Sequence, residues 1–261
     1  MGNSQTRKIN MPRLERITKS EFEQVGALGQ TEVETTDGLQ IIINNPEAYR
    51  RAMTPENSER PVVLFISGTS ESGKSTFGKL AVESGIGHRV KIYATLADVR
   101  DEMGAVSDEP TSYDYGTRIA SDSSLTDETA KGILNKYKRL MNETDVPIVV
   151  VETIKHRWMV DRFKQFSDIR FLSIFIDADL EKRIEREAEK TGKSLDSVRA
   201  EVLDKDEWKR ELGSESIDKV ADIHVVNNGS FNTYRTMVVS FLEALKDNSQ
   251  DYSGIPIDFS R

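Results

Sequence analysis

Short apolar runs alternate with longer amphipathic segments along most of this chain. Beyond Pro61 the apolar runs have five or six residues, which is typical of strands covered on both faces. The segments between them repeat apolar residues every three to four positions, as a helix with one buried face does. This alternation predicts βαβ units and an α/β fold with a parallel sheet. We expect five strands, at Val62–Ser67, Arg89–Ala94, Val146–Val151, Phe171–Ile176 and Asp222–Val226.

Helices are expected after the first, before the third and after the last of these strands. The first runs from about Lys74 to Glu83, directly after a loop rich in glycine and serine. The second lies within Ser121–Met141, where apolar residues follow a 3.6-residue period and Ser124-Leu-Thr-Asp127 has the spacing of a capping box. The last follows Gly229-Ser230 and carries one apolar stripe. We therefore expect the sheet to lie between helices.

The first sixty residues differ from the rest of the chain. They are polar and of mixed charge, with one short β-like run at Leu39–Ile43. Asn45-Pro46 favours a helix start, with one or two turns over Glu47–Met53. We expect an N-terminal arm over 1–60 that is disordered to about residue 20 and partly folded on the main domain from 21 to 60. Complete disorder of its first half is the alternative. The main domain then spans 61–246, and a loose polar tail spans 247–261.

Composition and charge narrow the classes of function. Of 261 residues, 37% are hydrophobic and 31% are charged, as in a soluble globular protein. The net charge of −8 argues against general nucleic-acid binding, which needs a basic surface, so no nucleic-acid partner is expected. The absence of cysteine excludes disulfides and thiolate chemistry and fits a cytoplasmic location. No apolar stretch approaches the length of a membrane span, so no membrane partner is expected.

One motif carries the main functional prediction. Gly68-Thr-Ser-Glu-Ser-Gly73-Lys74-Ser75 directly follows the first apolar run and fits the phosphate-binding P-loop pattern G-x-x-x-x-G-K-[ST]. The two glycines allow the backbone to curl until successive N–H groups point at one anion, and the following helix adds the positive end of its dipole. An ordinary glycine-rich turn would not need the whole motif. We expect the nucleotide to contact Gly68, Thr69, Ser70, Glu71, Ser72, Gly73, Lys74, Ser75 and Thr76.

The motif also assigns catalytic and metal-binding roles. Lys74 is expected to reach the β- and γ-phosphates of ATP and to stabilise the migrating charge, which makes it a catalytic residue. The Ser75 hydroxyl is expected to bind Mg²⁺. Glu152 ends the third strand, on the edge where ligands bind in open α/β sheets. It is a second candidate for the metal, through water, or for positioning the acceptor. A carboxylate that caps the next helix is the alternative.

A P-loop alone leaves GTPases, motor ATPases and small-molecule kinases open. A switch GTPase should carry a guanine-reading motif of the N-K-x-D kind after a late strand, and this chain has Asn227-Asn-Gly-Ser230 there. A motor ATPase normally pairs an acidic residue after the third strand with oligomerisation elements. Here the third strand leads straight into Glu152-Thr-Ile-Lys155. These segments favour a small-molecule kinase.

Four segments, in their order along the chain, resemble the group of nucleoside monophosphate kinases and dephospho-CoA kinases. Besides the P-loop, Val150–Lys155 resembles that group's strand ending in Asp-Gly-Ile-Arg, with Glu, Thr and Lys where Asp, Gly and Arg are usual. Asp177–Arg186 resembles the start of the lid, and Lys219–Ser230 is similar to the segment that closes on the adenine. The resemblance covers about 61–246. It implies a P-loop, nucleotide-kinase-like three-layer fold with a five-stranded parallel sheet, and it assigns Asn227 and Gly229 to the nucleotide.

The resemblance also implies a helical lid over about 183–218. Arg183 and Arg186 start a helix just after the fourth strand and are expected to close over the phosphates as catalytic residues. This suits phosphoryl transfer, in which positioning and cationic stabilisation dominate. A solvated helix face held by ordinary i,i+4 pairs is the alternative, and we favour it for Arg199 and Arg210. The dense charge of the remaining segment suits a mobile lid that excludes water.

The acceptor site is expected between the second and third strands. Asp98 lies directly after the second strand and is a catalytic candidate that would accept the proton of a hydroxyl acceptor. Arginines in this region would hold a phosphate as bidentate donors, and Tyr113 or Tyr115 would stack on a base. Surface arginines and packing tyrosines are the alternatives. The candidate substrate-binding residues are Arg100, Tyr115, Arg118 and Lys155.

These features predict a Mg²⁺-dependent kinase that transfers the γ-phosphoryl group of ATP to a small acceptor. The resemblance implies a nucleotide-like acceptor, such as a nucleoside or deoxynucleoside monophosphate or dephospho-CoA. An NTP-binding switch, or a slow NTPase that acts on a protein partner, is the main alternative. A nucleic-acid end kinase is a further one, which the acidic balance disfavours. The sequence leaves open the purine preference, the oligomeric state and the role of the arm.

Overall fold

The computed structural model describes residues 17–20, 22, 32–54, 60–103 and 112–247. The predictions for residues 1–16 and for the tail after 247 lie outside them. The strands are β1 (Glu32–Glu34), β2 (Leu39–Ile43), β3 (Val62–Gly68), β4 (Gly87–Lys91), β5 (Ile148–Glu152), β6 (Arg170–Asp177) and β7 (Ile223–Asn227). The helices are α2 (Pro46–Met53), α3 (Lys74–Glu83), α4 (Ile92–Glu102), α5 (Ser112–Ile119), α6 (Ser123–Thr144), α7 (Arg157–Phe163), α8 (Leu180–Thr191), α9 (Leu195–Glu211), α10 (Ser214–Asp218) and α11 (Phe231–Asp247).

The strands form one sheet in the order β1-β2-β7-β6-β3-β5-β4. The five strands from β7 to β4 run parallel, as the sequence predicts, and β1 and β2 add an antiparallel hairpin beside β7. The described sheet therefore has seven strands, and the prediction of five is wrong. The extra pair has a physical reason: Leu39, Ile41 and Ile43 alternate with less buried residues, so β2 buries one face while its backbone pairs with β7.

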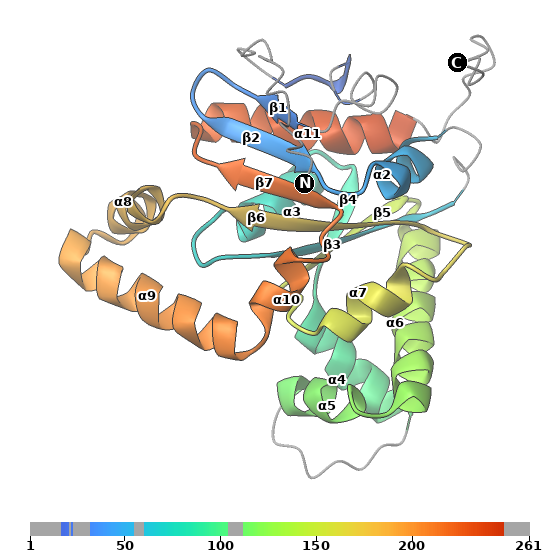
Figure 1. Cartoon of the computed structure of the whole chain (residues 1–261). Coiled ribbons are helices and arrows are strands. Elements are labelled where there is room, and N and C mark those ends of the chain that lie inside the picture. The colour runs from blue at the N-terminus through green and yellow to red at the C-terminus, as the bar shows by residue number, and fades with distance from the viewer. Residues whose placement is uncertain (1–16, 21, 23–31, 55–59, 104–111, 248–261) are drawn as a thin grey trace, which may run out of the picture.

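The described chain forms three layers (Figure 1). The central strand β3 is buried along its whole length. Its residues Val62, Leu64 and Ile66 join a core with α2, α3 and α11 on one face of the sheet. Val63 and Phe65 join a second core with α4, α6 and α7 on the other face. This arrangement holds the carboxyl end of β3, and the loop that follows it, in a rigid frame.

Two local predictions are wrong. The second strand ends at Lys91, and Ile92 already begins α4, because Ile92, Leu96 and Val99 form one buried helical stripe. The capping box of α6 is also not used. Asp122 caps this helix instead, by accepting hydrogen bonds from the N–H groups of Ser124 (2.9 Å) and Leu125 (3.3 Å).

The helices α8 and α9 lie where the sequence predicts the lid, beyond the carboxyl ends of β3 and β6 (Figure 1). They pack on each other through a small core of Ile184, Val198 and Val202 that is separate from the two main cores. The pair therefore has its own packing, and polar side chains such as Arg183 and Asp206 connect it to the loop after β3. Among the described helices, none combines the length and apolar character that a membrane span needs.

Candidate functional site

The P-loop is shaped by two glycines that no other residue replaces easily. Gly68 ends β3 with φ 136°, and a Cβ at this position would lie 1.9 Å from the carbonyl oxygen of Ile176 on β6. Gly73 has φ 112°, and a Cβ there would lie 2.7 Å from the Asn227 amide nitrogen. The loop thus turns back against its neighbours, and α3 begins at Lys74. This is the backbone curl that the sequence predicts.

Lys74 turns its amine onto its own loop. The ammonium contacts the Thr69 carbonyl oxygen and lies 3.4 Å from the Ser72 hydroxyl oxygen. Burial lowers the pKa of Lys74 well below its usual value, and the approaching ammonium of Lys209 from α9 lowers it further. Ser75, the next residue, is exposed on the first turn of α3. The lysine is therefore held at the loop, in an environment that favours the arrival of negative charge.

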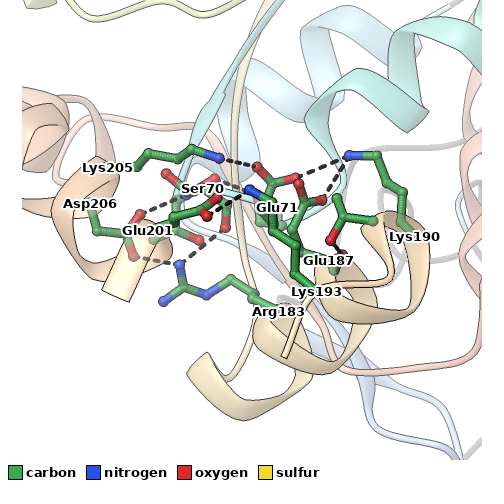
Figure 2. Close-up of polar contacts among 12 residues, drawn as sticks. Ser70, Glu71, Arg183, Glu187, Lys190, Lys193, Glu201, Lys205 and Asp206 are labelled. Atoms are coloured by element: carbon green, nitrogen blue, oxygen red, sulfur yellow. Dashed lines mark hydrogen bonds and ion pairs between the residues drawn. The ribbon is translucent and has the colours of Figure 1, made fainter. Parts of the chain in front are cut away.

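Asp206 and Arg183 connect the helix pair to the loop (Figure 2). The Ser70 N–H donates to the Asp206 carboxylate at 2.8 Å, and Arg183 donates to the Ser70 carbonyl oxygen at 3.1 Å while it pairs with the same carboxylate. Arg183 is also fixed by the Ala178 carbonyl oxygen at 3.0 Å. Burial acts against the ionised Asp206, but the hydrogen bonds from Ser70 and Arg183 hold its pKa below the usual value. Ser70 thus already donates its N–H to the helix pair.

Glu71, at the tip of the loop, forms ion pairs with both helices of the pair (Figure 2). Its carboxylate lies 3.4 Å from the Lys205 ammonium on α9 and 3.8 Å from the Lys190 ammonium on α8. Glu71 has φ 56°, in the left-handed region that non-glycine residues seldom adopt. Burial acts against its charged form, yet the two lysines lower its pKa. Together with Asp206, Glu71 fastens the helix pair down on the loop.

Positive charge accumulates beside the loop. Lys209 lines a polar pocket of about 470 Å³ together with Thr69, Arg183 and Asp206. Lys155, only 7% exposed, places its ammonium 3.7 Å from the centroid of the Trp208 ring. Burial lowers the pKa of Lys155 to about 8, and the charge of Lys209 contributes to this shift. Lys209 thus lowers the pKa of both Lys74 and Lys155, and an anion bound near these amines would relieve this repulsion.

A pH titration of Trp208 fluorescence tests this electrostatic arrangement. The chain has two tryptophans, so in a Trp158→Phe variant the emission comes from Trp208 alone. Below its pKa of about 8 Lys155 presents a cation to the indole, and above that pH it is neutral. We therefore expect the emission to change with a midpoint near pH 8 when pH is varied between about 6 and 10.

Two lysine variants, made in the Trp158→Phe background, control this titration. Lys155→Met should abolish the inflection, because it removes the titrating cation from the ring. Lys205→Met removes an exposed lysine from α9, the helix that carries Trp208, and should leave the inflection in place. An inflection that persists in Lys155→Met would assign the titration to another group and contradict the pKa of Lys155.

The segment Asn227–Ser230, called the base segment below, is braced from two sides of the site. Arg186 donates to the carbonyl oxygens of Asn227 and Gly229, each at 2.8 Å. The Asn227 amide donates to the Ser72 carbonyl oxygen of the P-loop at 2.9 Å. Arg186 therefore contacts the base segment in this structure, whereas Arg183 contacts the loop. The two arginines, each a predicted candidate for closing over the phosphates, are placed differently.

Glu152 is buried at the end of β5 and forms a two-point ion pair. Arg89 of β4 donates to its two carboxylate oxygens at 2.7 and 3.0 Å. Gly78 of α3 makes room for this pair, since a Cβ there would lie 2.1 Å from a Glu152 oxygen. The carboxylate thus braces β4 against β5 and does not cap the next helix. Its role toward Mg²⁺ stays a prediction.

The predicted acceptor residues are not gathered around the loop. Asp98 is exposed on α4 and pairs with Lys136 at 2.7 Å, and Arg100 pairs with its neighbour Asp101 at 3.0 Å. Tyr115 is 1% exposed within the core, so it offers no free ring face to a base, and the Arg118 guanidinium lies 5.4 Å above this ring. The Tyr113 side chain lies outside the described part. Of the four predicted substrate-binding residues, only Lys155 interacts with Lys209 beside the loop.

Sequence reasoning missed several residues of the site. Lys209 was one charge among many, and Asp206 and Arg89 were not singled out. One signal was present: Asp206 and Lys209 continue the helical stripe begun by Val198 and Val202, which is the buried side of α9. Charged residues on the buried stripe of an amphipathic helix are a sign of a site.

Comparison with known proteins finds kinases among the relatives that are similar in sequence. No protein-family model matches the chain. It is 29% identical to the "UPF0200/UPF0201 protein" of Archaeoglobus fulgidus over 194 residues, which are 73% of this chain and 57% of that protein. It is 23% identical to uridine kinases of Lactiplantibacillus plantarum, over 58% of this chain and 79% of theirs, and of Streptococcus pneumoniae, over 67% and 89%. The resemblance to P-loop small-molecule kinases is confirmed.

Solved structures with a similar arrangement include TT1252 from Thermus thermophilus, with a TM-score of 0.43 and 19% identity over 70% of this chain and 97% of that one. Dephospho-CoA kinase from Campylobacter jejuni has a TM-score of 0.36 and 15% identity over 72% and 98%. The chain spans little more than half of the length of its Archaeoglobus relative. The match therefore leaves part of that relative without a counterpart in this chain.

Proposed function

We propose that this chain is a Mg²⁺-dependent phosphotransferase that moves the γ-phosphoryl group of ATP to a small, nucleotide-like acceptor. The observation that carries the proposal is the convergence of Lys74, Arg183 and Lys209 on a complete P-loop. Phosphoryl transfer needs cations placed around the migrating group more than it needs covalent chemistry. The likeness to uridine kinases supports a kinase, and it leaves the identity of the acceptor open.

Each group of residues has its own role in the proposed phosphoryl transfer. The N–H groups of the P-loop and the start of α3 hold the phosphates, and Lys74 releases Thr69 to neutralise charge on the γ-phosphate. An acceptor oxygen attacks the γ-phosphorus, the bond to the β,γ-bridging oxygen breaks, and ADP leaves. Arg183 and Lys209 stabilise the charge that develops on the way. A phosphate acceptor needs no base, and Asp98, the predicted base for a hydroxyl acceptor, lies on α4 and pairs with Lys136 in the structure, so that role stays a prediction.

The residues fit a magnesium ion at the start of α3. Ser75 is exposed there, on the first turn after the loop, so its hydroxyl is accessible to a metal ion that would bind with the phosphates. Glu152 has both oxygens committed to Arg89 and would reach such an ion through water only. The metal supplies charge neutralisation of the β- and γ-phosphates when it is bound.

The helix pair α8–α9 acts as the lid in this proposal. In the structure it is fastened on the P-loop through Ser70 and Glu71, so admission of a triphosphate requires these contacts to loosen. The separate small core of the pair allows it to move as a unit. Closure over bound nucleotide then brings Arg183 and Lys209 to the phosphates and excludes water.

An acceptor panel tests the proposal. Purified protein is incubated with Mg²⁺, ATP and one acceptor at a time: nucleoside and deoxynucleoside monophosphates, nucleosides and dephospho-CoA. We expect ADP formation that depends on one class of acceptor, with the phosphorylated product detected by mass spectrometry. ATP binding without acceptor-dependent ADP formation would favour the nucleotide switch instead. Failure to bind ATP at all would exclude both functions.

A further inference from the structure

The turn between β1 and β2 lies beside the start of α11 (Figure 1). A hydrogen bond joins Asp37 of this turn to Ser230 of the base segment. The Ser230 N–H donates to the Asp37 carboxylate at 2.8 Å, and the Thr233 hydroxyl donates to the same oxygen at 2.6 Å. The Thr35 hydroxyl donates to the second oxygen at 2.6 Å. The Ser230 hydroxyl accepts from the Thr233 N–H at 3.2 Å and caps α11, so Asp37 supports the cap of a helix that lies almost two hundred residues further along the chain.

The charge of Asp37 is well stabilised in this position. Burial acts against the ionised form, but the hydrogen bonds from Ser230, Thr233 and Thr35 lower the pKa of Asp37 to about 2. The carboxylate also faces the positive end of the dipole of α11, a helix of 17 residues. It is thus a permanent anion at any physiological pH, and its loss would leave the Ser230 N–H without this acceptor.

The hairpin turn touches the base segment along its length. A Cβ on Gly229 would lie 3.0 Å from an Asp37 oxygen and 3.1 Å from the Leu39 Cβ. A Cβ on Gly38, which has φ 93°, would lie 3.5 Å from the Asn228 Cβ. Such close approach leaves the backbone of residues 228–230 little room to shift on the side of the arm.

The other side of the base segment belongs to the nucleotide site. Arg186 binds the carbonyl oxygens of Asn227 and Gly229, and the Asn227 amide binds Ser72 in the P-loop. The Asn228 side chain accepts a hydrogen bond of 2.8 Å from the Asp179 N–H, at the start of α8. The base segment is therefore held between the arm on one side and the lid and P-loop on the other.

We propose that Asp37 is a positioning residue for the nucleotide, and that the β1–β2 hairpin gives the base segment the shape that receives the purine. This inference rests on the proposed function, and it adds the assignment of the base segment to the base of ATP, which the resemblance of Lys219–Ser230 to nucleotide kinases implies. The arm then has a function at the site that the main domain alone does not provide. Asp37 does not touch the phosphates, so its effect is confined to the part of the ligand that inorganic polyphosphate lacks.

Two ligands separate this role from a general loss of structure. Calorimetric titration with Mg²⁺-ATP and with Mg²⁺-tripolyphosphate measures base and phosphate recognition together, and then phosphate recognition alone. In Asp37→Ala we expect ATP affinity to fall about tenfold, while tripolyphosphate affinity stays that of the wild type. Asp37→Asn keeps an acceptor for Ser230 and loses the charge, so it should show a smaller, intermediate loss. Glu32→Ala, an exposed carboxylate on the same hairpin, is the control and should bind both ligands normally.

Each outcome of these titrations either supports or overturns the role of Asp37. Unchanged ATP affinity in Asp37→Ala, or equal losses for ATP and tripolyphosphate, would overturn the inference. If Asp37→Ala does not fold, Asp37→Asn decides in the same way, since wild-type ATP affinity in that variant would overturn the role of the charge. Wild-type protein that binds neither ligand would refute the proposed function itself, which is a different result from a failure of Asp37 alone.

Discussion

Lys74→Ala is expected to reduce phosphoryl transfer by about a thousandfold or more. Removal of one preorganised donor from a developing anion costs about 10²–10³ in kcat, and Lys74 is proposed to meet the phosphates directly. The melting temperature should not fall, because the ammonium is partly desolvated and lies beside Lys209 in the free protein. The measurement is acceptor-dependent ADP formation at saturating ATP, together with thermal unfolding of the same preparation.

The matched control is Lys79→Ala. Lys79 lies on the same helix, is exposed, and carries the same charge, so its removal changes the net charge equally but not the loop. It should retain wild-type turnover. Turnover of Lys74→Ala within a fewfold of the wild type, in a folded protein, would show that the P-loop does not act in transfer. A large drop in melting temperature would instead make Lys74 a structural residue.

Lys74→Ala is expected to retain stability because this site buries several lysine amines, which is unfavourable in the free protein. Lys74, Lys155 and Lys209 each have a pKa lowered first by burial, and the charge of Lys209 adds to the shifts of Lys74 and Lys155. A fold selected for stability alone would not gather them. Their proximity makes sense once a polyphosphate is present, so binding of ATP should raise the melting temperature, and more at low ionic strength.

The elements that the sequence predicts well are those whose pattern and end signals agree. α3 spans the predicted Lys74–Glu83, because Gly73 adopts a conformation that ends the loop and begins the helix. β2 spans the predicted Leu39–Ile43 through strict alternation. That β2 would pair with β7 could not be read from the sequence, because the partner of an edge strand depends on which backbone groups remain open.

The site is only partly readable from the sequence for a related reason. P-loop residues are contiguous, and each has a backbone or charge requirement of its own, so one motif predicts all of them. Lys205 and Lys209 look equivalent in the sequence, yet Lys205 is exposed and Lys209 reaches the loop. The two lysines lie one turn apart on nearly the same face of α9, so the difference is where along its length the helix meets the loop. The packing of Val198 and Val202 on Ile184 sets this placement, which is a property of contacts between helices.

Lys209→Met should lower kcat by about a hundredfold and change ATP affinity much less. Methionine keeps the apolar stem that packs along α9 and removes only the charge. In the structure the Lys209 ammonium approaches Lys74, and in the proposed mechanism this places it at the phosphates when transfer occurs. A cation that acts mainly on developing charge contributes to kcat more than to binding. The measurements are kcat with saturating acceptor and the dissociation constant of Mg²⁺-ATP.

Lys205→Met is the matched control for this prediction, since Lys205 lies one turn earlier on α9 and pairs with Glu71 in an exposed position. Its loss should weaken lid docking slightly and leave kcat within about threefold of the wild type, because exposed ion pairs contribute little. Lys209→Arg keeps the charge and should recover much of the activity. The opposite split, with ATP affinity lost and kcat retained in Lys209→Met, would make Lys209 a ground-state contact. The cation that stabilises transfer from the lid would then be Arg183, whose guanidinium is already fixed between Ser70 and Asp206.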